Sequence, residues 1–350
     1  MLGRFFGLVL STLVIADSAL ANDGFGGISA TGLTFGQTDA VAMVEEDLFI
    51  GIDRISVDYL FRNLTDKDVA GEVIFPMPPI SLGQMMMSDW NLPDDLGREN
   101  LLNFSVRVEG KSVPVSIDRI AVVEPVWEEG RPLSEQYDTP GLDVTALLQK
   151  LGLPMTLETD EVISALSALP IEARRELADA GAVEMFGDGS GPDEILPNWS
   201  IVLRYHWNQN FPAGQDLRIS HSYENRPWGG IFIWREPPTD EWLADLQARY
   251  CIDKGTSSAI MKRLKDSASS GDDYVTGMSY NIAYVLRTAN SWAGPISKFR
   301  LTLDKGAANN VISLCADGVK KSGPTTFVVE KTNFTPTSDI EVLIVLPLAQ

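Results

Sequence analysis

Short runs of alternating apolar and polar residues most limit what this chain can fold into. In residues 54–63, RISVDYLFRN, the side chains of Ile55, Val57, Tyr59 and Phe61 share one face, because side chains alternate across a β-strand. Similar runs fill residues 28–123 and recur from residue 198 onward. Among them are LNFSVRVEG, WSIVLRYHW, YNIAYVLRT, KFRLTLD and IEVLIVL. The pattern predicts a mainly β protein with antiparallel, β-sandwich-like N-terminal and C-terminal parts.

Helix signals are confined to two stretches of the chain. Between residues 126 and 197, Asp143 and Asp160 are placed to cap short helices, and Pro170 suits the first turn of a third. A further helical region is expected near residues 240–265, where EWLADLQARY has apolar residues at helical spacing. The prediction is therefore an N-terminal β-sandwich-like domain over 22–125, a helical insertion or linker over 126–197, and a C-terminal β-rich domain over 198–350.

The first 21 residues have the three parts of an export signal. Arg4 supplies a positive start, FFGLVLSTLVIA is an apolar run, and Ala19–Leu20–Ala21 forms a small-x-small cleavage site. The run is shorter than the roughly 20 residues that a spanning helix needs, so an N-terminal membrane anchor is the less favoured alternative. We expect a signal peptide at 1–21 and a mature protein that is periplasmic or secreted, with no stable membrane insertion.

The net charge of −20 excludes one class of partner. Binding to nucleic acid or to an anionic membrane surface needs a cationic footprint, which this acidic chain lacks. Solubility in a crowded exported space is the favoured explanation, and cation binding is the alternative. The segment GDGSGPDE at 187–194 has the composition of a calcium loop but lacks alternate ligands at the required spacing. We expect no cofactor and leave loose calcium binding open.

Cys251 and Cys315 are the two cysteines of the chain. In an oxidising compartment such a pair predicts one disulfide. It would close a loop of about 65 residues and stabilise the fold by roughly 4 kcal/mol on the chain-entropy model. The alternatives are a catalytic thiol, which needs a base nearby, and two buried free thiols. The two histidines, His206 and His221, lie in other segments, so the disulfide is favoured.

The chain carries none of the common catalytic signatures that we compared it with. It has no G-x-x-x-x-G-K-[ST] phosphate loop, no G-x-S-x-G nucleophile elbow and no H-E-x-x-H zinc pair. His206 and His221 would approach Glu224 only if their strands are neighbours, and ordinary structural histidines are favoured. Trp127–Glu129 and Trp207 would suit a sugar site, but aromatic residues at a sandwich edge are the favoured explanation. No catalytic residue and no metal ligand is predicted.

A methionine-rich loop is the first candidate for a binding surface. Met85, Met86 and Met87 are consecutive and are followed by Trp90. Methionine-rich surfaces adapt to different partners because the side chain is flexible and polarisable. A loop folded back over the end of the sandwich is the favoured alternative.

The second candidate is the segment TANSWAGPISKFRL at 288–301. Asn290 and Trp292 stand directly ahead of a well-patterned strand. The Gly–Pro step favours a turn, and an asparagine side chain is able to hold one. A structural corner with Trp292 as a plug is therefore favoured over a binding surface.

Several segments together resemble a known family. The run VAMVEEDLFIGIDRISVDYLFRNLTDKDVAGEVIFPMP, with YHWNQNFPAG, YVLRTANSWAGPISKFRLTLDKG and TPTSDIEVLIV, is similar to the exported bacterial family called domain of unknown function 4424. The resemblance covers nearly the whole mature chain and implies an exported protein with no assigned activity, so no catalytic residue is carried over. The N-terminal part also resembles the β-sandwich modules of inter-alpha-trypsin-inhibitor heavy chains, a fold-level analogy that does not set function.

The sequence favours a non-enzymatic interaction or scaffolding protein that docks an envelope protein or a polymer. That hypothesis predicts an exposed aromatic or methionine-rich patch. The alternative is a periplasmic hydrolase acting on sugar or peptide, which predicts a pocket with converging carboxylates, or a histidine with a carboxylate. A structural or metal-buffering protein is a third hypothesis, and it predicts calcium-dependent melting.

Overall fold

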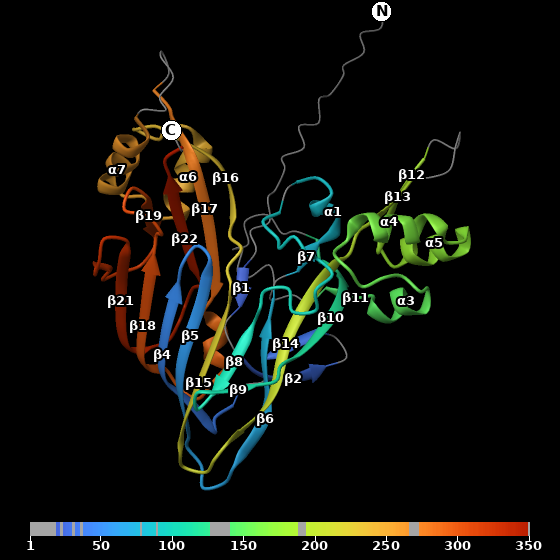
Figure 1. The fold of residues 1–350 in the computed structure, drawn as a ribbon, viewed down its shortest axis with the longest axis horizontal. Helices are drawn as coiled ribbons and strands as arrows, with labels where there is room; N and C mark the ends of the chain where they lie inside the picture. The colour runs from blue at the N-terminus through green and yellow to red at the C-terminus, as the bar shows by residue number, and fades with distance from the viewer. Residues whose placement is uncertain are drawn as a thin grey trace, which may run out of the picture.

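The computed structural model describes residues 19–21, 24–29, 32–35, 38–77, 79–88, 90–126, 141–187, 194–265 and 273–348. Within these ranges the chain is mainly β, and its strands form three large sheets and one two-stranded sheet, β12 (Val183–Phe186) with β13 (Glu194–Pro197). The expected fold class is confirmed (Figure 1). The two pairs β4–β18 and β1–β17 are parallel, so the sheets they join are mixed.

The largest sheet, sheet C, has eight strands. Its order is β20-β21-β18-β4-β5-β15-β8-β9. The strands are β4 (Val41–Ile50), β5 (Arg54–Asn63), β8 (Ser105–Val108), β9 (Lys111–Val113), β15 (Asp216–Glu224), β18 (Ile296–Asp304), β20 (Lys320–Lys321) and β21 (Thr326–Phe334). Strand β5 has the predicted alternation, since Ile55, Val57, Tyr59 and Phe61 are buried.

A second sheet, sheet B, has seven strands. Its order is β11-β10-β14-β6-β2-β3, and β7 pairs with β14. The strands are β2 (Gly24–Ser29), β3 (Gly32–Phe35), β6 (Val69–Pro76), β7 (Ile80–Ser81), β10 (Ser116–Val123), β11 (Leu142–Asp143) and β14 (Ser200–Phe211). Strand β14 is central, because it pairs with β10 on one edge and with β6 on the other.

The chain passes between sheets B and C at one end of the molecule. Figure 1 shows β5 running into β6, and β14 into β15, at the tip where the two sheets converge. Strand β14 lies between β10 and β6, and β15 lies between β5 and β8. The parts expected over 22–125 and 198–350 therefore contribute strands to the same two sheets.

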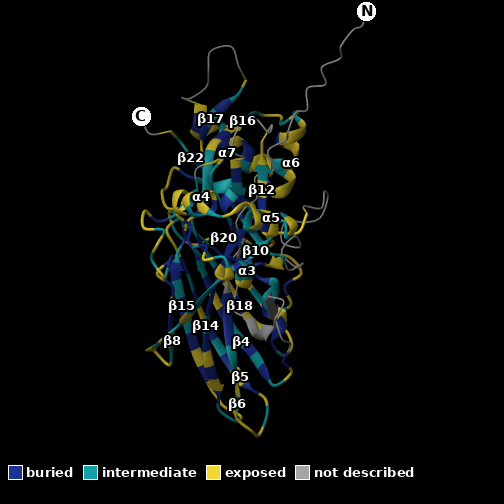
Figure 2. Ribbon diagram, turned by 90° about the vertical axis from the view of Figure 1, so that its right-hand side faces the viewer, coloured by how far each residue is buried: buried dark blue, intermediate teal, exposed yellow. Residues whose placement is uncertain are grey.

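An aromatic layer fills the space between sheets B and C. The ring of Phe75 on β6 lies 4.8 Å from that of Phe104, which precedes β8, and 5.2 Å from that of His221 on β15. Tyr205 on β14 lies 4.7 Å from Phe104. Buried residues follow the strands in Figure 2. Because buried aromatic side chains remove large apolar areas from water, this layer is the main link between the sheets.

The third sheet, sheet A, carries its own small core. It contains β16 (Trp228–Trp234), β17 (Val275–Val285), β22 (Ile340–Leu346) and β19 (Val311–Leu314), and β1 (Ala19–Ala21) also pairs with β17. Helices α6 (Glu241–Arg249) and α7 (Lys254–Leu264) cover one face and confirm the helical region expected near 240–265. Phe232, Trp234, Leu243 and Ile260 pack together beneath them.

The helices expected within 126–197 are present. They are α3 (Thr145–Lys150), α4 (Thr159–Ala168) and α5 (Ile171–Asp179). Two caps differ in detail from the expectation. Asp143 accepts a hydrogen bond from the backbone N–H of Thr145 at 2.8 Å, one residue outside the cap position. Helix α4 already includes Asp160, and its cap residue Glu158 makes no side-chain capping bond.

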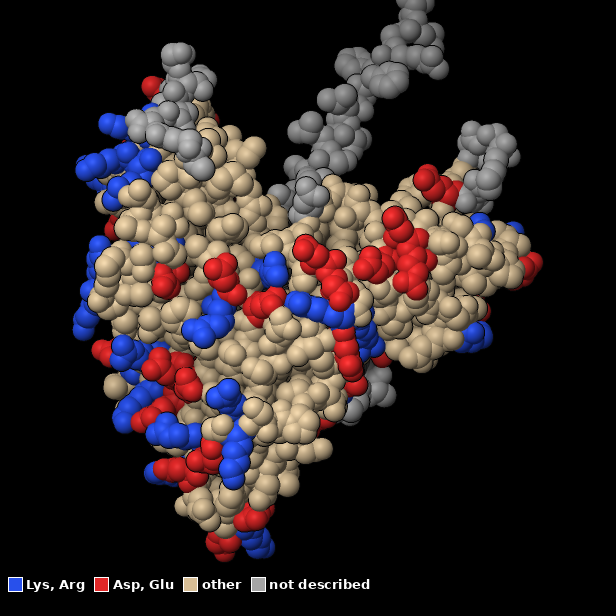
Figure 3. Space-filling view, viewed as in Figure 1, with Lys and Arg blue, Asp and Glu red and all other residues tan. Residues whose placement is uncertain are grey.

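Opposite charges alternate across the outer surface of sheet C. Lys298 Nζ lies 2.8 Å from Glu45 Oε1, and Arg62 Nε lies 2.5 Å from Asp216 Oδ1, each pair joining neighbouring strands. Figure 3 shows acidic and basic side chains interspersed over this part of the molecule. Exposed pairs of this kind add little stability, but they keep this face soluble. None of the helices in the described residues is long and apolar enough to span a bilayer.

The expected disulfide is present. Cys251 follows α6 and Cys315 follows β19, with 5.0 Å between their Cα atoms and a sequence separation of 64. The Ser313 hydroxyl donates to the Tyr250 carbonyl at 2.9 Å and holds the two segments side by side. The bond therefore fastens the helical cover of sheet A to the sheet beneath it.

Replacing both cysteines, Cys251→Ser with Cys315→Ser, should lower the free energy of unfolding by about 4 kcal/mol, because a loop of this length no longer restricts the unfolded chain. Urea unfolding under non-reducing conditions would measure this loss. A reductant should lower the urea midpoint of the parent to about that of the double variant. It should leave the midpoint of the double variant unchanged. A parent midpoint that does not respond to the reductant would contradict the assignment.

Candidate functional site

Strand β16 lies at the edge of sheet A and has apolar side chains on both faces. Among the described residues it pairs with β17 alone. Phe232 and Trp234 point towards α6 and α7, where the Trp234 indole N–H donates to the Ser257 hydroxyl at 3.0 Å. Side chains alternate along a strand, so Ile231 and Ile233 point to the opposite face. Their exposed fractions are 75% and 38%.

These isoleucines belong to a continuous apolar surface. The strand register places Ile231 opposite Met278 on β17, and Met278 opposite Leu346 on β22. Met278 is 39% exposed and Leu346 is half-buried. We call Ile231, Ile233, Met278 and Leu346 the apolar face, and Figure 3 shows few charged groups over β16 and β17. Isolated exposed apolar residues are common, but an ordered row on a sheet is typical of an interaction site.

A glycine at the start of β16 shapes the lower end of this surface. A Cβ on Gly229 would lie 2.7 Å from the Ser279 carbonyl oxygen and 2.8 Å from Cδ1 of Tyr280. Gly229 therefore lets the Tyr280 ring approach the strand closely. The surface continues from the half-buried Tyr280 to Ile282, which is fully buried in the main core. The apolar face is thus an exposed extension of that core.

The methionine segment, Met85–Trp90, lies beside the start of β16. Helix α1 (Leu82–Met85) begins where the Ser81 hydroxyl accepts a hydrogen bond from Gln84 N. Met85 and Trp90 pack against the main core, whereas Met87 is 75% exposed. The Asn91 side chain donates to the Pro227 carbonyl at 3.0 Å, one residue before β16.

The second candidate segment does not join this surface. Trp292 is only 2% exposed and its ring lies 4.5 Å from Phe61 and 5.8 Å from Phe211. Asn290 is exposed, and its side chain donates to the Pro336 carbonyl at 2.9 Å from the short helix η2 (Arg287–Ser291). Trp292 is thus a core residue. Its ring fills the space at the corner between η2 and β18, where it packs on Phe61 and Phe211. It is not available to a partner.

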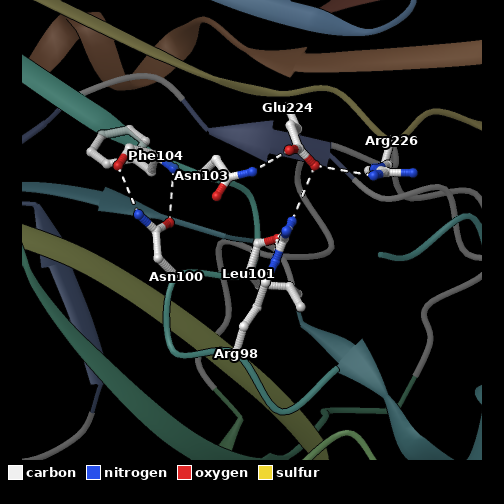
Figure 4. Close-up of polar contacts among 7 residues, drawn as sticks. All are labelled: Arg98, Asn100, Leu101, Asn103, Phe104, Glu224 and Arg226. Atoms are coloured by element: carbon white, nitrogen blue, oxygen red, sulfur yellow. Dashed lines mark hydrogen bonds and ion pairs between the residues drawn. The ribbon is translucent and has the colours of Figure 1, made fainter. Parts of the chain in front are cut away.

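A polar network next to the start of β16 centres on Glu224, the last residue of β15 (Figure 4). Arg98 Nη2 and Arg226 Nη2 each lie 3.1 Å from Glu224 Oε2. The Asn103 side chain donates to Oε1. We call Glu224, Arg98, Asn103 and Arg226 the Glu224 cluster. Burial by itself raises the pKa of Glu224, but hydrogen bonds from Arg226, Asn103 and Arg98 outweigh it and hold that pKa below its usual value.

The Glu224 cluster links sheet C, where Glu224 ends β15, to sheet B, where Arg119 lies on β10. Arg98 also donates through Nε to the Leu101 carbonyl at 2.7 Å. Arg119 on β10 donates to the Arg98 carbonyl at 2.8 Å and to the Met155 carbonyl at 3.1 Å. Arg226 leads directly into β16, and Arg98 follows the methionine segment. The cluster therefore sets the positions of both parts of the surface.

A second titratable group lies on sheet B. His206 Nδ1 is 2.6 Å from Glu72 Oε1, and Nε2 is 3.3 Å from Asp118 Oδ2. The buried Arg204 donates through Nε to the same Asp118 oxygen at 3.1 Å. Ser116 stands opposite His206 across β10 and β14. The imidazole on β14 thus lies between carboxylates from the two strands that flank it, Glu72 on β6 and Asp118 on β10.

The two histidines and Glu224 do not come together. His206 points away from the aromatic layer, whereas His221 lies within it, 5.7 Å from Tyr59 and 5.2 Å from Phe75. Glu224 is held by arginines in its own cluster. Within the part of the chain that the structure describes, no group of three or more His, Cys, Asp or Glu side chains is arranged to hold a metal ion.

The candidate sugar site is not supported by burial. Trp207 is 3% exposed and packs in the main core, so its ring does not face solvent. Trp127–Glu129 and most of the segment 187–194 lie outside the described residues. The apolar face was missed by the sequence analysis, although WGGIFIW at 228–234 has no polar residue on either face, which is a usable signal of an exposed apolar strand.

Comparison with known proteins gives a family and distantly similar solved structures. A family model described as "Domain of unknown function (DUF4424)" matches residues 21–343. No curated protein matches. A crystal structure from Legionella pneumophila subsp. pneumophila strain Philadelphia 1, described as a "putative nutrient binding protein", is similar at 13% identity and a TM-score of 0.44. That alignment covers 94% of this chain and 71% of the other, and at this TM-score it supports no further argument.

The Glu224 cluster should make stability depend on pH. Because the pKa of Glu224 is lowered in the folded state, its carboxylate stabilises the fold above the ordinary value of 4.5, and this contribution is lost as the pH falls through the folded pKa. Glu224→Gln should therefore melt below the parent at pH 7, and the difference should shrink towards pH 3. Melting curves across this range would test it. A difference that grows as the pH falls would contradict the assignment.

Proposed function

The chain belongs to the DUF4424 family of unknown function, and from its own geometry we propose that it is a non-catalytic binding protein of the cell envelope. The apolar face receives the partner, and the methionine segment forms the adaptable side of the site. The observation that carries the proposal is the row Ile231–Met278–Leu346, an apolar extension of the core that remains open to solvent.

The chemistry of the surface favours a protein partner with an extended apolar segment. Strand β16 lies at a sheet edge, and edge strands offer backbone hydrogen-bonding groups to an added strand. Alternate side chains of such a strand would lie beside Ile231 and Ile233. Met87 is 75% exposed on the neighbouring segment, and a flexible thioether adapts to partner side chains of different shapes.

An exported location fits this function. A disulfide such as Cys251–Cys315 persists in oxidising compartments and is rare in the cytosol. Together with the small-x-small site that ends at Ala21, it supports removal of residues 1–21 and release into the periplasm or beyond. An apolar docking surface would then serve a partner in the same compartment.

A photo-crosslinking amino acid at position 231 tests the site. Introduced into the exported protein in its host, it should form an adduct with one partner protein, because the side chain is 75% exposed on the apolar face. The matched control carries the crosslinker at Lys320, an exposed position on β20 of sheet C. Adding Met278→Lys to the position-231 protein should remove the adduct without changing the melting temperature, because Met278 shares the face.

Three outcomes would contradict this proposal. No adduct from position 231 would show that the face is not used. The same species from positions 231 and 320 would show collision without specificity. An adduct at twice the chain mass would replace the partner protein by a second copy of this chain.

The hydrolase alternative has one observation in its favour, the His206 imidazole held by Glu72 with Ser116 opposite it. A general base needs a ring nitrogen that is able to take a proton from the substrate or nucleophile. Here both ring nitrogens face carboxylates, and Arg204 is already paired with Asp118. The group is therefore better suited to joining three strands than to catalysis.

Replacing His206 by Gln separates these roles. We expect the parent to hydrolyse none of a panel of peptide, ester and glycoside substrates. His206→Gln should lower the free energy of unfolding by about 1–3 kcal/mol, because it leaves the partly buried Glu72 carboxylate without its imidazole partner. Turnover by the parent that disappears in His206→Gln but persists in Lys320→Ala would favour the hydrolase instead.

A further inference from the structure

Several cations of this acidic chain gather at one edge of the molecule. Helix α7 carries Lys262 and Arg263 in its last turn, and Lys265 follows it directly. All three residues are exposed. Figure 3 shows Lys and Arg side chains grouped over α7 and along the edge below it. Charges more than about 10 Å apart are largely screened at 0.1 M salt, so this group has its own local potential despite the net charge of −20.

Lys305 adds a fixed charge next to this helix. It directly follows β18 and is only 8% exposed. Its ammonium group donates to the Ala308 carbonyl at 2.9 Å and to the Asn310 carbonyl. Burial lowers the pKa of Lys305 most, and repulsion from the cations of Lys321 and Arg263 lowers that pKa further. Both of these cations therefore lie close to Lys305.

These cations come from two neighbouring parts of the fold, α7 and the end of sheet C. Arg263 Nη1 donates to Asn309 Oδ1 at 3.1 Å, which fastens the helix to the loop that holds Lys305. Lys321 belongs to β20, where the alternation of side chains turns Lys320 to the opposite face of the sheet. We call the whole set the basic patch, and its members are Lys262, Arg263, Lys265, Lys305 and Lys321.

The basic patch takes part in none of the ion pairs formed among the described residues. Asp304, next to Lys305 in the chain, accepts a hydrogen bond from Gly306 N at 2.9 Å. Asp317 lies in the exposed loop between β19 and β20. The patch therefore keeps most of its positive charge available to an anionic partner.

An exposed apolar residue lies beside these charges. Val319 is 37% exposed in the loop that leads into β20, and the two lysines of β20 follow it directly. Gly318 has a φ of 80°, a backbone conformation that suits glycine, and this turn precedes Val319. Lysine side chains hold their charge at the level of lipid headgroups while their carbon stems lie against apolar material. The combination of lysines with a small apolar tip is thus suited to a membrane surface.

The composition of the basic patch favours lipid over protein as its partner. Interfaces between proteins are depleted in lysine and enriched in arginine and aromatic residues. Four of the five residues in the patch are lysines. Clustered lysines are attracted to anionic phospholipids through their charge, without a fixed geometry for each contact.

We propose that the basic patch holds the protein reversibly against an anionic phospholipid surface, with Val319 at the level of the headgroups. The acidic remainder of the chain is repelled by the same surface, so this edge faces the membrane. A few charges and one small apolar side chain give reversible attachment and no insertion. The expectation that the chain avoids anionic membranes considered the net charge alone. This attachment goes beyond the proposed function, since it requires neither Ile231 nor the methionine segment.

Vesicle sedimentation tests the attachment. The exported protein, purified from its host, is mixed with vesicles of equal parts phosphatidylglycerol and phosphatidylcholine, and with vesicles of phosphatidylcholine alone. At low ionic strength it should sediment with the anionic vesicles and remain in solution with the neutral ones. Raising the salt to about 1 M should release it, because the screening length then falls to about 3 Å.

A double variant separates the basic patch from the net charge. Lys262→Glu with Lys265→Glu should weaken binding to the anionic vesicles by on the order of a hundredfold, since each charge near such a surface contributes about fivefold. The matched control, Lys67→Glu with Lys111→Glu, changes the net charge equally at exposed positions before β6 and on β9, away from α7 (Figure 1). It should keep the parent's affinity within about threefold. Both variants should melt with the parent, because all four lysines are exposed.

Each contrary result would overturn the attachment to lipid. Equal sedimentation with both kinds of vesicle, or with neither, would show that anionic lipid is not recognised. Equal weakening in both double variants would show that the net charge decides binding. Release by inorganic phosphate, but not by chloride of equal ionic strength, would assign the patch to a free anion. Tighter binding of a poly-glutamate peptide than of anionic vesicles would assign it to an acidic protein segment. Crosslinking from position 231 does not depend on these lysines, so the proposed function and the attachment fail separately.

Discussion

Phe75 of β6 lies against Phe104, His221 and Tyr223, and this contact joins sheet B to sheet C. Removing one buried aromatic ring from such a layer costs about 3–5 kcal/mol, which is a large part of the stability of an ordinary domain. The two crossings of the chain, β5 to β6 and β14 to β15, bring the layer together from segments far apart in sequence. Every other element is placed relative to these two sheets.

The Glu224 cluster has a different role from the aromatic layer. Charged side chains at the surface contribute little when they act in isolated pairs, but here one carboxylate receives three donors, two from the loop before β8 and one from the residues that lead into β16. A network of this kind restricts the orientation of the segments that it joins more than it adds to the free energy of unfolding. It orients the start of β16 and the loop that follows the methionine segment, and so it determines where the exposed apolar residues lie.

The sequence predicts the local features of this protein well. Alternation in RISVDYLFRN, the cysteine pair and the helical spacing after Asp240 each depend on neighbouring residues, and each is present in the structure. The pairing of β4 with β18 joins Glu45 to Lys298 across 253 residues, and no local pattern encodes that. The exposure of Ile231 is likewise not encoded in the local sequence, because it depends on which face of β16 the helices α6 and α7 cover. The burial of Trp292, by contrast, follows from a local pattern. The Gly294–Pro295 turn was enough to favour a structural role for this residue over a binding role.

The parallel pairing of β4 with β18 also fixes an order of events during synthesis. Strand β4 has β5 as its partner almost as soon as it emerges, but its other edge waits until residues 296–304 have been made. Open edges are where partly folded chains aggregate. The middle of β4 carries Glu45, Glu46 and Asp47 in succession, and charges of this kind suppress pairing between chains. The acidic centre of β4 would protect the unfinished protein during the interval before its distant partner strand arrives.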